Sequence, residues 1–200
     1  MLDASRPEQK TAADFCDSLG VPRTIAELTK ERLRRAGARV KAENPMFAGD
    51  TGFRVFKLDS SNLTEWDPAA AQADLEGMLE LAVNNVKDGR SEADVLFELL
   101  LKLGLELTTP IETRLIAGKQ VHSVGAGALM VCLERGIDGS NYRELGQQIA
   151  DWTEAQDAAG GTQLVFLDSG FADDMAKTNM SALLEQRAKV LKKNWTVRSV

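Results

Sequence analysis

The apolar run from Leu164 to Leu167 is the clearest hydrophobic pattern in the chain. A pair of glycines precedes it and the polar turn 168–170 follows it, so the run predicts a buried strand. Asp173 and Asp174 then begin a helical pattern, because acidic side chains are favoured near the positive end of the helix dipole. Such a strand-to-helix corner is a common ligand site in open α/β sheets, but every ordinary β–α unit has the same pattern.

Short alternating runs predict the remainder of a sheet. Residues 112–117, 120–124 and 128–134 are separated by glycine-containing turns, which is typical of an antiparallel three-stranded meander. Single helices separate the third run from 164–167 and that strand from 195–200, so this trio is expected to be parallel. The predicted fold is α/β (or α+β), with a mixed sheet of about five to six strands and helices packed on it.

Two helices are predicted near the N-terminus. The first covers residues 6–19 and ends at Gly20, and the second starts at the capping box Thr24–Glu27 and continues through Val40. The second helix is basic over residues 30–41, so it is a candidate for DNA contact through phosphate groups. Glutamates alternate with the cations, and a solvated helix face is the alternative interpretation. The candidate contact residues are Lys30, Arg34, Arg35 and Arg39.

The middle of the chain predicts one more strand and two more helices. Residues 53–58 alternate as a strand that ends at Asp59, and residues 69–86 have helical spacing. The capping box Ser91–Asp94 opens a further helix whose apolar residues, up to Leu103, cover much of its circumference. That helix is therefore expected to pack deeply against a sheet or another chain.

Composition and charge narrow the class of protein. The chain has 200 residues, 44% of them hydrophobic and 27% charged, which suits a globular protein with one core or two small cores. A net charge of −6 argues against a dedicated nucleic-acid binder, although a local basic patch is compatible with it.

Few residues suggest disulfide, metal or membrane chemistry. Cys16 lies in a helical pattern and Cys132 in a strand pattern, so no disulfide is expected and a reducing compartment fits better. His122 is the single histidine and has no metal-ligand spacing around it, so no metal site is predicted. No leader and no apolar run of membrane length is evident, so we expect a cytoplasmic protein without membrane contact.

No motif in the sequence is specific enough to indicate a catalytic reaction. A nucleophile–base pair, a phosphate-binding loop and a paired-carboxylate motif are not found. The best local cluster follows the strand at 164–167. Its side chains could bind a cation or polarise a substrate, or they could cap and pair to hold the corner, which is the favoured interpretation. The cluster consists of Asp168, Ser169, Asp173, Asp174, Lys177 and Asn179.

Several segments, in order, resemble one known family. They are Thr24–Ala36, Gly52–Asn62 with Trp66-Asp67, Leu100–Leu105 with Thr109–Ile111, Gly125–Leu129, and Asp168–Asp174 with Lys177–Asn179. These segments look like the C-terminal part of the modification (Mod) subunit of type III restriction-modification systems, a family of S-adenosylmethionine-dependent adenine-N6 DNA methyltransferases. The resemblance extends from about Pro7 to Val200.

The resemblance also shows what is missing. The family's catalytic Asp-Pro-Pro-Tyr motif and its Phe-x-Gly-x-Gly cofactor loop do not occur; neither Asp67-Pro68-Ala69 nor Phe47–Gly52 matches them. The resemblance therefore implies that this chain alone binds no S-adenosylmethionine and does not methylate DNA, and that it takes part in methylation only within a complete enzyme.

The resemblance implies that the two parts of the chain have different roles. Residues 1–62 would be a remnant of the cofactor half of a methyltransferase domain, with Asp59 near the adenine of the cofactor. Residues 63–200 would be a C-terminal assembly domain. The implied partners are a second copy in a homodimer, and the restriction subunit and DNA in the parent complex. Exposed sheet edges and the apolar helix after Ser91 are expected to need cover from such partners.

Overall fold

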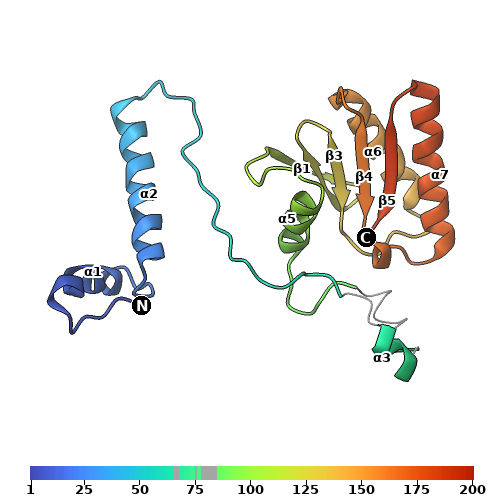
Figure 1. The fold of residues 1–200 in the computed structure, drawn as a ribbon. Coiled ribbons are helices and arrows are strands. Elements are labelled where there is room, and N and C mark those ends of the chain that lie inside the picture. The colour runs from blue at the N-terminus through green and yellow to red at the C-terminus, as the bar shows by residue number, and fades with distance from the viewer. Residues whose placement is uncertain (65–67, 75, 78–84) are drawn as a thin grey trace. The chain divides into compact units, whose positions relative to one another are not determined.

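The computed structural model describes residues 1–64, 68–74, 76–77 and 85–200. The chain divides into two compact units, Met1–Leu58 and Asp59–Val200 (Figure 1). The boundary expected after residue 62 lies inside the second unit, because residues 59–62 are bonded to a helix of that unit.

The N-terminal unit contains the two expected helices, α1 (Pro7–Ser18) and α2 (Ile25–Glu43). Gly20 adopts a φ of +66°, which favours glycine, directly after α1. Thr24 caps α2 by accepting a hydrogen bond from the Glu27 amide at 3.3 Å. The Arg35 guanidinium lies 5.0 Å from the centre of the Phe15 ring, so a cation–π contact joins the two helices.

The predicted strand at residues 53–58 is wrong. These residues form no strand, and among the described residues no strand pairs with them. Alternation specifies which side chains would share a buried face, but a strand also needs a neighbour for its backbone groups. The described part of this unit has no such neighbour.

The C-terminal unit is built on one five-stranded mixed sheet, in the order β1-β2-β3-β4-β5. The first three strands form the predicted antiparallel meander, and β3, β4 and β5 are parallel, as expected. The α/β prediction is therefore confirmed. The strands are β1 (Ile111–Ile116), β2 (Lys119–Val124), β3 (Leu129–Cys132), β4 (Thr162–Phe166) and β5 (Trp195–Ser199). The helices are α3 (Pro68–Ala73), α5 (Glu92–Lys102), α6 (Tyr142–Gln156), the 3-10 turn η1 (Asp168–Gly170) and α7 (Asp174–Leu191).

A two-residue turn sets the register of the first hairpin. Ile116 pairs with Lys119, and between them Ala117 and Gly118 have φ values of 47° and 76°. Positive φ at both central residues is the type I′ geometry, whose twist matches that of the flanking strands.

The helix predicted over residues 69–86 agrees with α3 at its start, but residues 75 and 78–84 lie outside the described residues. Its predicted end is wrong. Val86 forms an antiparallel bridge with Leu63, and the amides of Thr64 and Lys87 donate to the carbonyls of Asn85 and Asn62 at 2.6 and 2.9 Å. At residues 85–87, backbone hydrogen bonds to residues 62–64 form in place of the helix that the apolar spacing predicts.

Each face of the sheet has its own hydrophobic core. On one face, α6 and α7 bury residues of β2, β3 and β4, and on the other face α5 packs against the same three strands (Figure 1). The first core includes Val121, Met130, Leu145, Ile149, Leu164, Phe166, Met180 and Leu184. The second includes Val95, Leu96, Leu99, Leu100, Val124, Leu129, Val131, Val165 and Leu167.

The apolar helix α5 is thus covered by its own sheet, which decides between the two expected partners of this helix. Its capping box is present: Ser91 accepts from the Asp94 amide, and the Asp94 carboxylate accepts from the Ser91 amide. In contrast to the buried leucines of α5, the Leu101 side chain is 59% exposed. No second chain is required to bury α5.

Both cysteines are free and buried, in agreement with the absence of a predicted disulfide. Burial raises the pKa of the Cys132 thiol to about 11. In the parts of the chain that the structure describes, no helix combines the length and the apolar character needed to cross a membrane.

The burial of α5 predicts unequal effects for two adjacent leucines. Leu100→Ala removes a fully buried side chain and should lower the free energy of unfolding by about 2–5 kcal/mol, because a cavity remains. Leu101→Ala changes an exposed side chain and should cost less than about 1 kcal/mol. Urea unfolding followed by circular dichroism measures both; equal effects would contradict the packing of α5 on the sheet.

Candidate functional site

The predicted corner lies at the carboxyl ends of the parallel strands. Asp168 lies two residues after this end of β4, and its amide donates to the Val200 carbonyl at 2.7 Å. The Asp168 carboxylate forms an ion pair with Lys177 of α7. The hydrogen bond from Lys177, together with one from Ser199, lowers the pKa of Asp168. The lysine therefore already neutralises the carboxylate that a cation or a substrate would need.

The other residues of the predicted cluster are not gathered around Asp168. The Asp173 carboxylate caps α7, accepting from the Ala176 amide at 2.7 Å, and Asp174 lies in the first turn of that helix. The Ser169 hydroxyl is buried and has no partner among the described residues. Asn179 is half-buried on α7. The arrangement can hold a strand-to-helix corner, because Asp168 is paired with Lys177 and Asp173 caps α7.

The four candidate DNA-contacting cations of α2 are each within 4 Å of a glutamate on the same helix. Their nitrogen-to-oxygen distances are 2.6 Å for Lys30–Glu27, 3.6 Å for Arg34–Glu31, 2.7 Å for Arg35–Glu31 and 2.6 Å for Arg39–Glu43. Such i,i+3 and i,i+4 pairs are typical of a solvated helix face.

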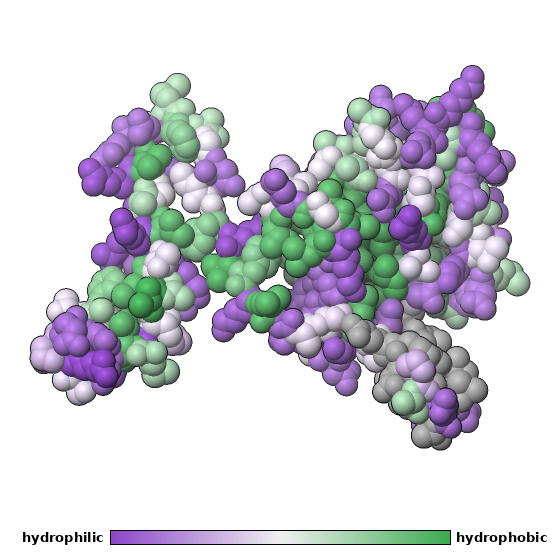
Figure 2. Space-filling view, viewed as in Figure 1, coloured by the Kyte–Doolittle hydropathy of each residue, from purple (hydrophilic) through white to green (hydrophobic). Residues whose placement is uncertain are grey.

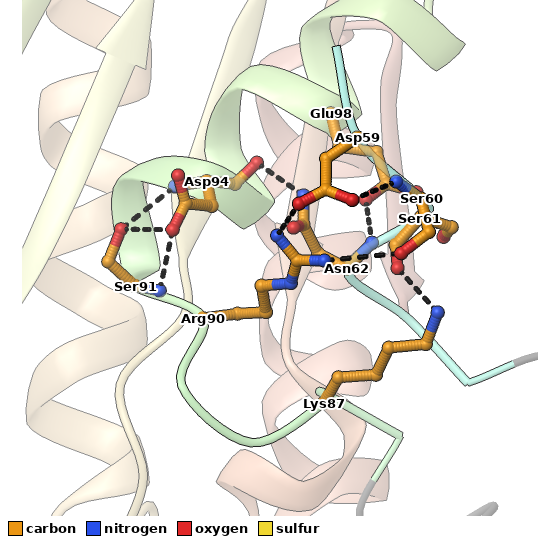
Figure 3. A network of polar contacts seen from close by, with 9 residues as sticks. All are labelled: Asp59, Ser60, Ser61, Asn62, Lys87, Arg90, Ser91, Asp94 and Glu98. Carbon is orange, nitrogen blue, oxygen red and sulfur yellow. Dashed lines mark hydrogen bonds and ion pairs between the residues drawn. The ribbon is translucent and has the colours of Figure 1, made fainter. Parts of the chain in front are cut away.

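The most extensive polar network in the second unit lies elsewhere, where residues 59–62 meet α5 (Figure 3). Glu98 is its centre: one carboxylate oxygen accepts from the Ser61 hydroxyl and the other from the Asn62 amide, both at 2.6 Å. Lys102 lies 2.8 Å from the same carboxylate. Burial alone would raise the pKa of Glu98, but hydrogen bonds from Lys102, Ser61 and Asn62 lower it to about 2.

Further bonds fix the backbone of this segment. The Asn62 side-chain amide donates to the Asp94 carbonyl at 2.9 Å, and Lys87 donates to the Ser61 carbonyl at 2.7 Å (Figure 3). Asparagine and lysine donors thus satisfy two backbone carbonyls, which would otherwise need water or other donors. These bonds hold the segment beside α5.

Asp59, the residue implied to lie near a cofactor, belongs to this network. Its carboxylate is 3.0 Å from Arg90, and Arg90 also donates to the Ser60 hydroxyl at 3.2 Å (Figure 3). The hydrogen bond from Arg90 lowers the pKa of Asp59 and is the largest cause of that shift. Asp59 is therefore engaged with a residue of its own unit.

Sequence reasoning missed Glu98 and Arg90. Glu98 was visible as an isolated acid among the apolar residues of α5, where a carboxylate needs partners if it is even partly buried. Nothing local indicated that those partners would come from residues 61 and 62, far back in the chain.

A pocket of about 630 Å³ lies at the opposite ends of the parallel strands, where β4 and β5 begin. Gln163 and Arg198 line it, together with the glycine-containing loops 125–126 and 158–161. The side-chain amide oxygen (Oε1) of Gln163 is buried without a partner among the described residues. Ligands of parallel α/β sheets usually bind at the carboxyl ends of the strands, so this pocket does not coincide with the predicted corner. Across the described ranges, no group of three His, Cys, Asp or Glu side chains could hold a metal ion.

The Glu98 network predicts a pH-dependent stability. Glu98→Gln should lower the free energy of unfolding by about 1–3 kcal/mol at neutral pH, because charged hydrogen bonds to Ser61 and Asn62 are lost. The folded pKa of about 2 lies below the ordinary value of 4.5. The difference from the parent chain should therefore be complete above pH 4.5 and disappear as the pH falls toward 2.

Hydrogen exchange at the amides of residues 62 and 64 reports this effect locally, and chemical unfolding at each pH reports it globally. Glu185→Gln is the matched control, because it removes one exposed carboxylate of α7. Equal effects of the two substitutions, or a difference that persists at pH 2, would refute the role of Glu98.

The two adjacent acids at the start of α7, Asp173 and Asp174, are expected to contribute unequally to the free energy of unfolding. Asp173→Ala removes the N-cap of α7 and should lower the free energy of unfolding by about 1 kcal/mol. Asp174→Ala removes only a favourable helix-dipole interaction and should cost about 0.3 kcal/mol. Thermal unfolding of both variants provides the measurement, and a larger loss for Asp174→Ala would contradict the capping role.

Comparison with known proteins gives no family for this fold and network. No protein-family model matches the chain, no curated protein matches it, and no solved structure matches it. Function is therefore argued from the geometry of the two units and from the resemblance of the sequence segments.

Proposed function

We propose that this chain serves as the C-terminal part of a type III Mod subunit, an adenine-N6 DNA methyltransferase, and that its role there is assembly. The Met1–Leu58 unit completes the cofactor half of a methyltransferase domain contributed by another polypeptide segment. The Asp59–Val200 unit is the assembly domain, with the restriction subunit and DNA as partners in the parent complex. S-adenosylmethionine binds only to the completed domain.

The exposure of apolar side chains in segment 53–58, which forms no strand, is the observation that carries this proposal. The sequence of this segment alternates as a strand, yet no described strand pairs with it. Val55 is 53% exposed and Leu58 is fully exposed, although both side chains suit the interior of a sheet. A segment with these properties fits as a strand added to a sheet that lies outside this chain.

The rest of the N-terminal unit supports the same interpretation. Helix α2 has no buried residue, and only Ala13 and Cys16 are buried in α1. Hydrophobic side chains remain visible on this unit (Figure 2). The large exposed ones are Met1, Leu19, Ile25, Leu33, Val40, Met46, Phe47, Phe53, Val55, Phe56 and Leu58. Apolar surface on this scale, relative to so small a unit, marks an interaction site.

The network around Glu98 gives the assembly domain a defined connection to segment 53–58. Asp59 follows directly after Leu58; residues 61 and 62 are bonded to Glu98 of α5, and Asp59 to Arg90 just before that helix. A strand that joined another sheet would therefore emerge from a fixed point on the Asp59–Val200 unit. Ordered attachment reduces the entropy lost on association.

The proposal predicts complementation between two polypeptides. The DNA immediately upstream of this reading frame should encode Asp-Pro-Pro-Tyr and a Phe-x-Gly-x-Gly loop. The chain and the upstream polypeptide, when co-expressed, should form a complex that binds S-adenosylmethionine in calorimetry, whereas this chain alone should not. Affinity of the isolated chain for S-adenosylmethionine would overturn the proposal, as would upstream DNA without these motifs.

Two variants locate the contact. Val55→Asp should weaken the complex by about a hundredfold or more, because it buries an unpaired charge in the new strand. Met46→Asp is the matched control: it places the same charge on a side chain of this unit that is 95% exposed and lies outside the predicted strand. Equal loss of complex with both variants would contradict strand addition.

A further inference from the structure

The pocket where β4 and β5 begin lies on the face of the sheet that α5 covers. β4 and β5 begin at the upper end of the sheet in Figure 1. Val165 of β4 belongs to the core beneath α5, and Gln163, two residues earlier on the same face, lines the pocket. Thr196 and Arg198 of β5 line it as well, and both are exposed. A stretch of sheet face beside the α5 core therefore forms the floor of the pocket.

Two glycine-containing loops form walls of the pocket. In the turn between β2 and β3, a Cβ atom on Gly127 would lie 2.6 Å from the Cβ atom of Gln156. In the loop before β4, Gly161 has a φ of +87°, and a Cβ atom there would lie 2.5 Å from the Asn194 carbonyl oxygen. A side chain fits at neither position, so the walls are packed in place without a ligand. The volume of about 630 Å³ is typical of small-molecule sites.

The pocket contains one charge without a counterion. Asp157 and Arg198 are the two charged residues that line it. Asp157 forms an ion pair with Lys193, whereas the Arg198 guanidinium has no ion pair or hydrogen bond with any described residue. A guanidinium presents its N–H donors in a planar fork that matches a carboxylate or a phosphate. The uncompensated charge of Arg198 therefore favours an anion.

The Gln163 carboxamide is a second polar group of the pocket without a partner. It forms no hydrogen bond with any described residue, and its oxygen is buried. Buried polar atoms are nearly always hydrogen-bonded, so this side chain is suited to a ligand that completes its bonds. A half turn of the amide exchanges its oxygen and its nitrogen, so the side chain can present an acceptor or a donor. Glutamine uses both groups together when it pairs with the edge of a nucleobase.

We infer that this pocket binds a small anion built on a flat ring with an amide-like edge, such as a nucleoside monophosphate. The ring lies against Leu103 and Leu105, which are half-buried and line the pocket just after α5. The edge of the ring pairs with the Gln163 carboxamide, and the phosphate or carboxylate pairs with Arg198.

The strand register places the two polar groups within reach of one such molecule. Gln163 pairs with Thr196, which is two residues before Arg198 on the neighbouring parallel strand. Gln163 and Arg198 therefore project from the same face, with Cα atoms roughly 8 Å apart from strand spacing and rise. A molecule of nucleotide size spans that separation.

This site does not rest on the proposed function. Its residues all belong to the Asp59–Val200 unit, whereas the completed cofactor domain is assigned to Met1–Leu58. The pocket also lies at the end of the parallel strands opposite to the carboxyl ends, where ligands of α/β sheets usually bind. Failure of the site would leave the complementation experiment unchanged, and the reverse also holds.

Titration of the full-length chain with three probes tests the class of ligand. Uridine monophosphate and orotate share a pyrimidine ring with an amide-like edge and carry a phosphate and a carboxylate, and uridine has the ring without the anion. In NMR spectra, at least one of the two anions should give saturable shifts of the Gln163 side-chain amide and the Arg198 Nε–H. Uridine should bind about tenfold more weakly or less, because the charge-assisted hydrogen bonds are missing.

The pattern of responses identifies the anion. Saturation with uridine monophosphate alone assigns a phosphate, saturation with orotate alone assigns a carboxylate, and saturation with both assigns either anion. Absence of saturation with both anions at millimolar concentration would overturn the inference. Uridine that binds as tightly as the anions would overturn it as well.

Substitution of Arg198 locates the anion. Arg198→Gln should weaken binding of the anionic probe by about tenfold or more, because the guanidinium fork is lost. Arg135→Gln is the matched control, since it removes another exposed arginine of the same unit that does not line the pocket. Equal effects of the two substitutions would contradict an anion site at Arg198.

Substitution of Gln163 separates binding from a structural role. Gln163→Leu removes an unsatisfied buried oxygen and keeps a side chain of similar size, so the urea midpoint should stay unchanged or rise. Binding of the same probe should weaken by about tenfold, because the hydrogen bonds to the ring edge are lost. Unchanged binding, or a midpoint that falls together with binding, would overturn the inference.

Discussion

The second unit depends on burying a mixed sheet on both faces. Parallel strands such as β3 and β4 are apolar on both sides and must be covered on both sides. Helices α6 and α7 cover one face, and α5 covers the other together with residues such as Leu63, Val86 and Leu105. This requirement commits the apolar side of α5 to its own sheet, so the helix cannot serve at the same time as a hydrophobic contact to another chain.

The opposite side of α5 binds residues 59–62. Glu98, Asp94 and the residues just before the helix bind the backbone and side chains of residues 59–62 (Figure 3). Glu98 is a partly buried carboxylate, and it stays charged because the donors around it outweigh the cost of burial. One helix thus closes the second core and fixes the start of the Asp59–Val200 unit. The N-terminal unit contrasts with this arrangement: its helices are capped and paired locally, yet it buries few side chains.

The proposed function depends on exposed apolar surface. Segment 53–58 and α2 expose apolar side chains that a methyltransferase sheet would bury, and this is the basis of the proposed function. Apolar surface, and not a catalytic cluster, supports the assembly role. At the Asp168 corner, the candidate site predicted from the sequence, Lys177 neutralises the carboxylate.

The sequence by itself determined the local features: the hairpin at Ala117-Gly118, the caps at Ser91 and Asp173, and the order of meander and parallel strands. Hydrophobic periodicity, helix caps and turns depend on residues only a few positions apart. They can therefore be recognised in the sequence before the fold is known. Only the tertiary structure decided that Glu98 binds residues 61 and 62, that Val86 pairs with Leu63, and that residues 53–58 form no strand. Those outcomes depend on which segments far apart in the sequence come together. A strand needs a neighbouring strand for its backbone groups, and a buried carboxylate needs hydrogen-bond donors.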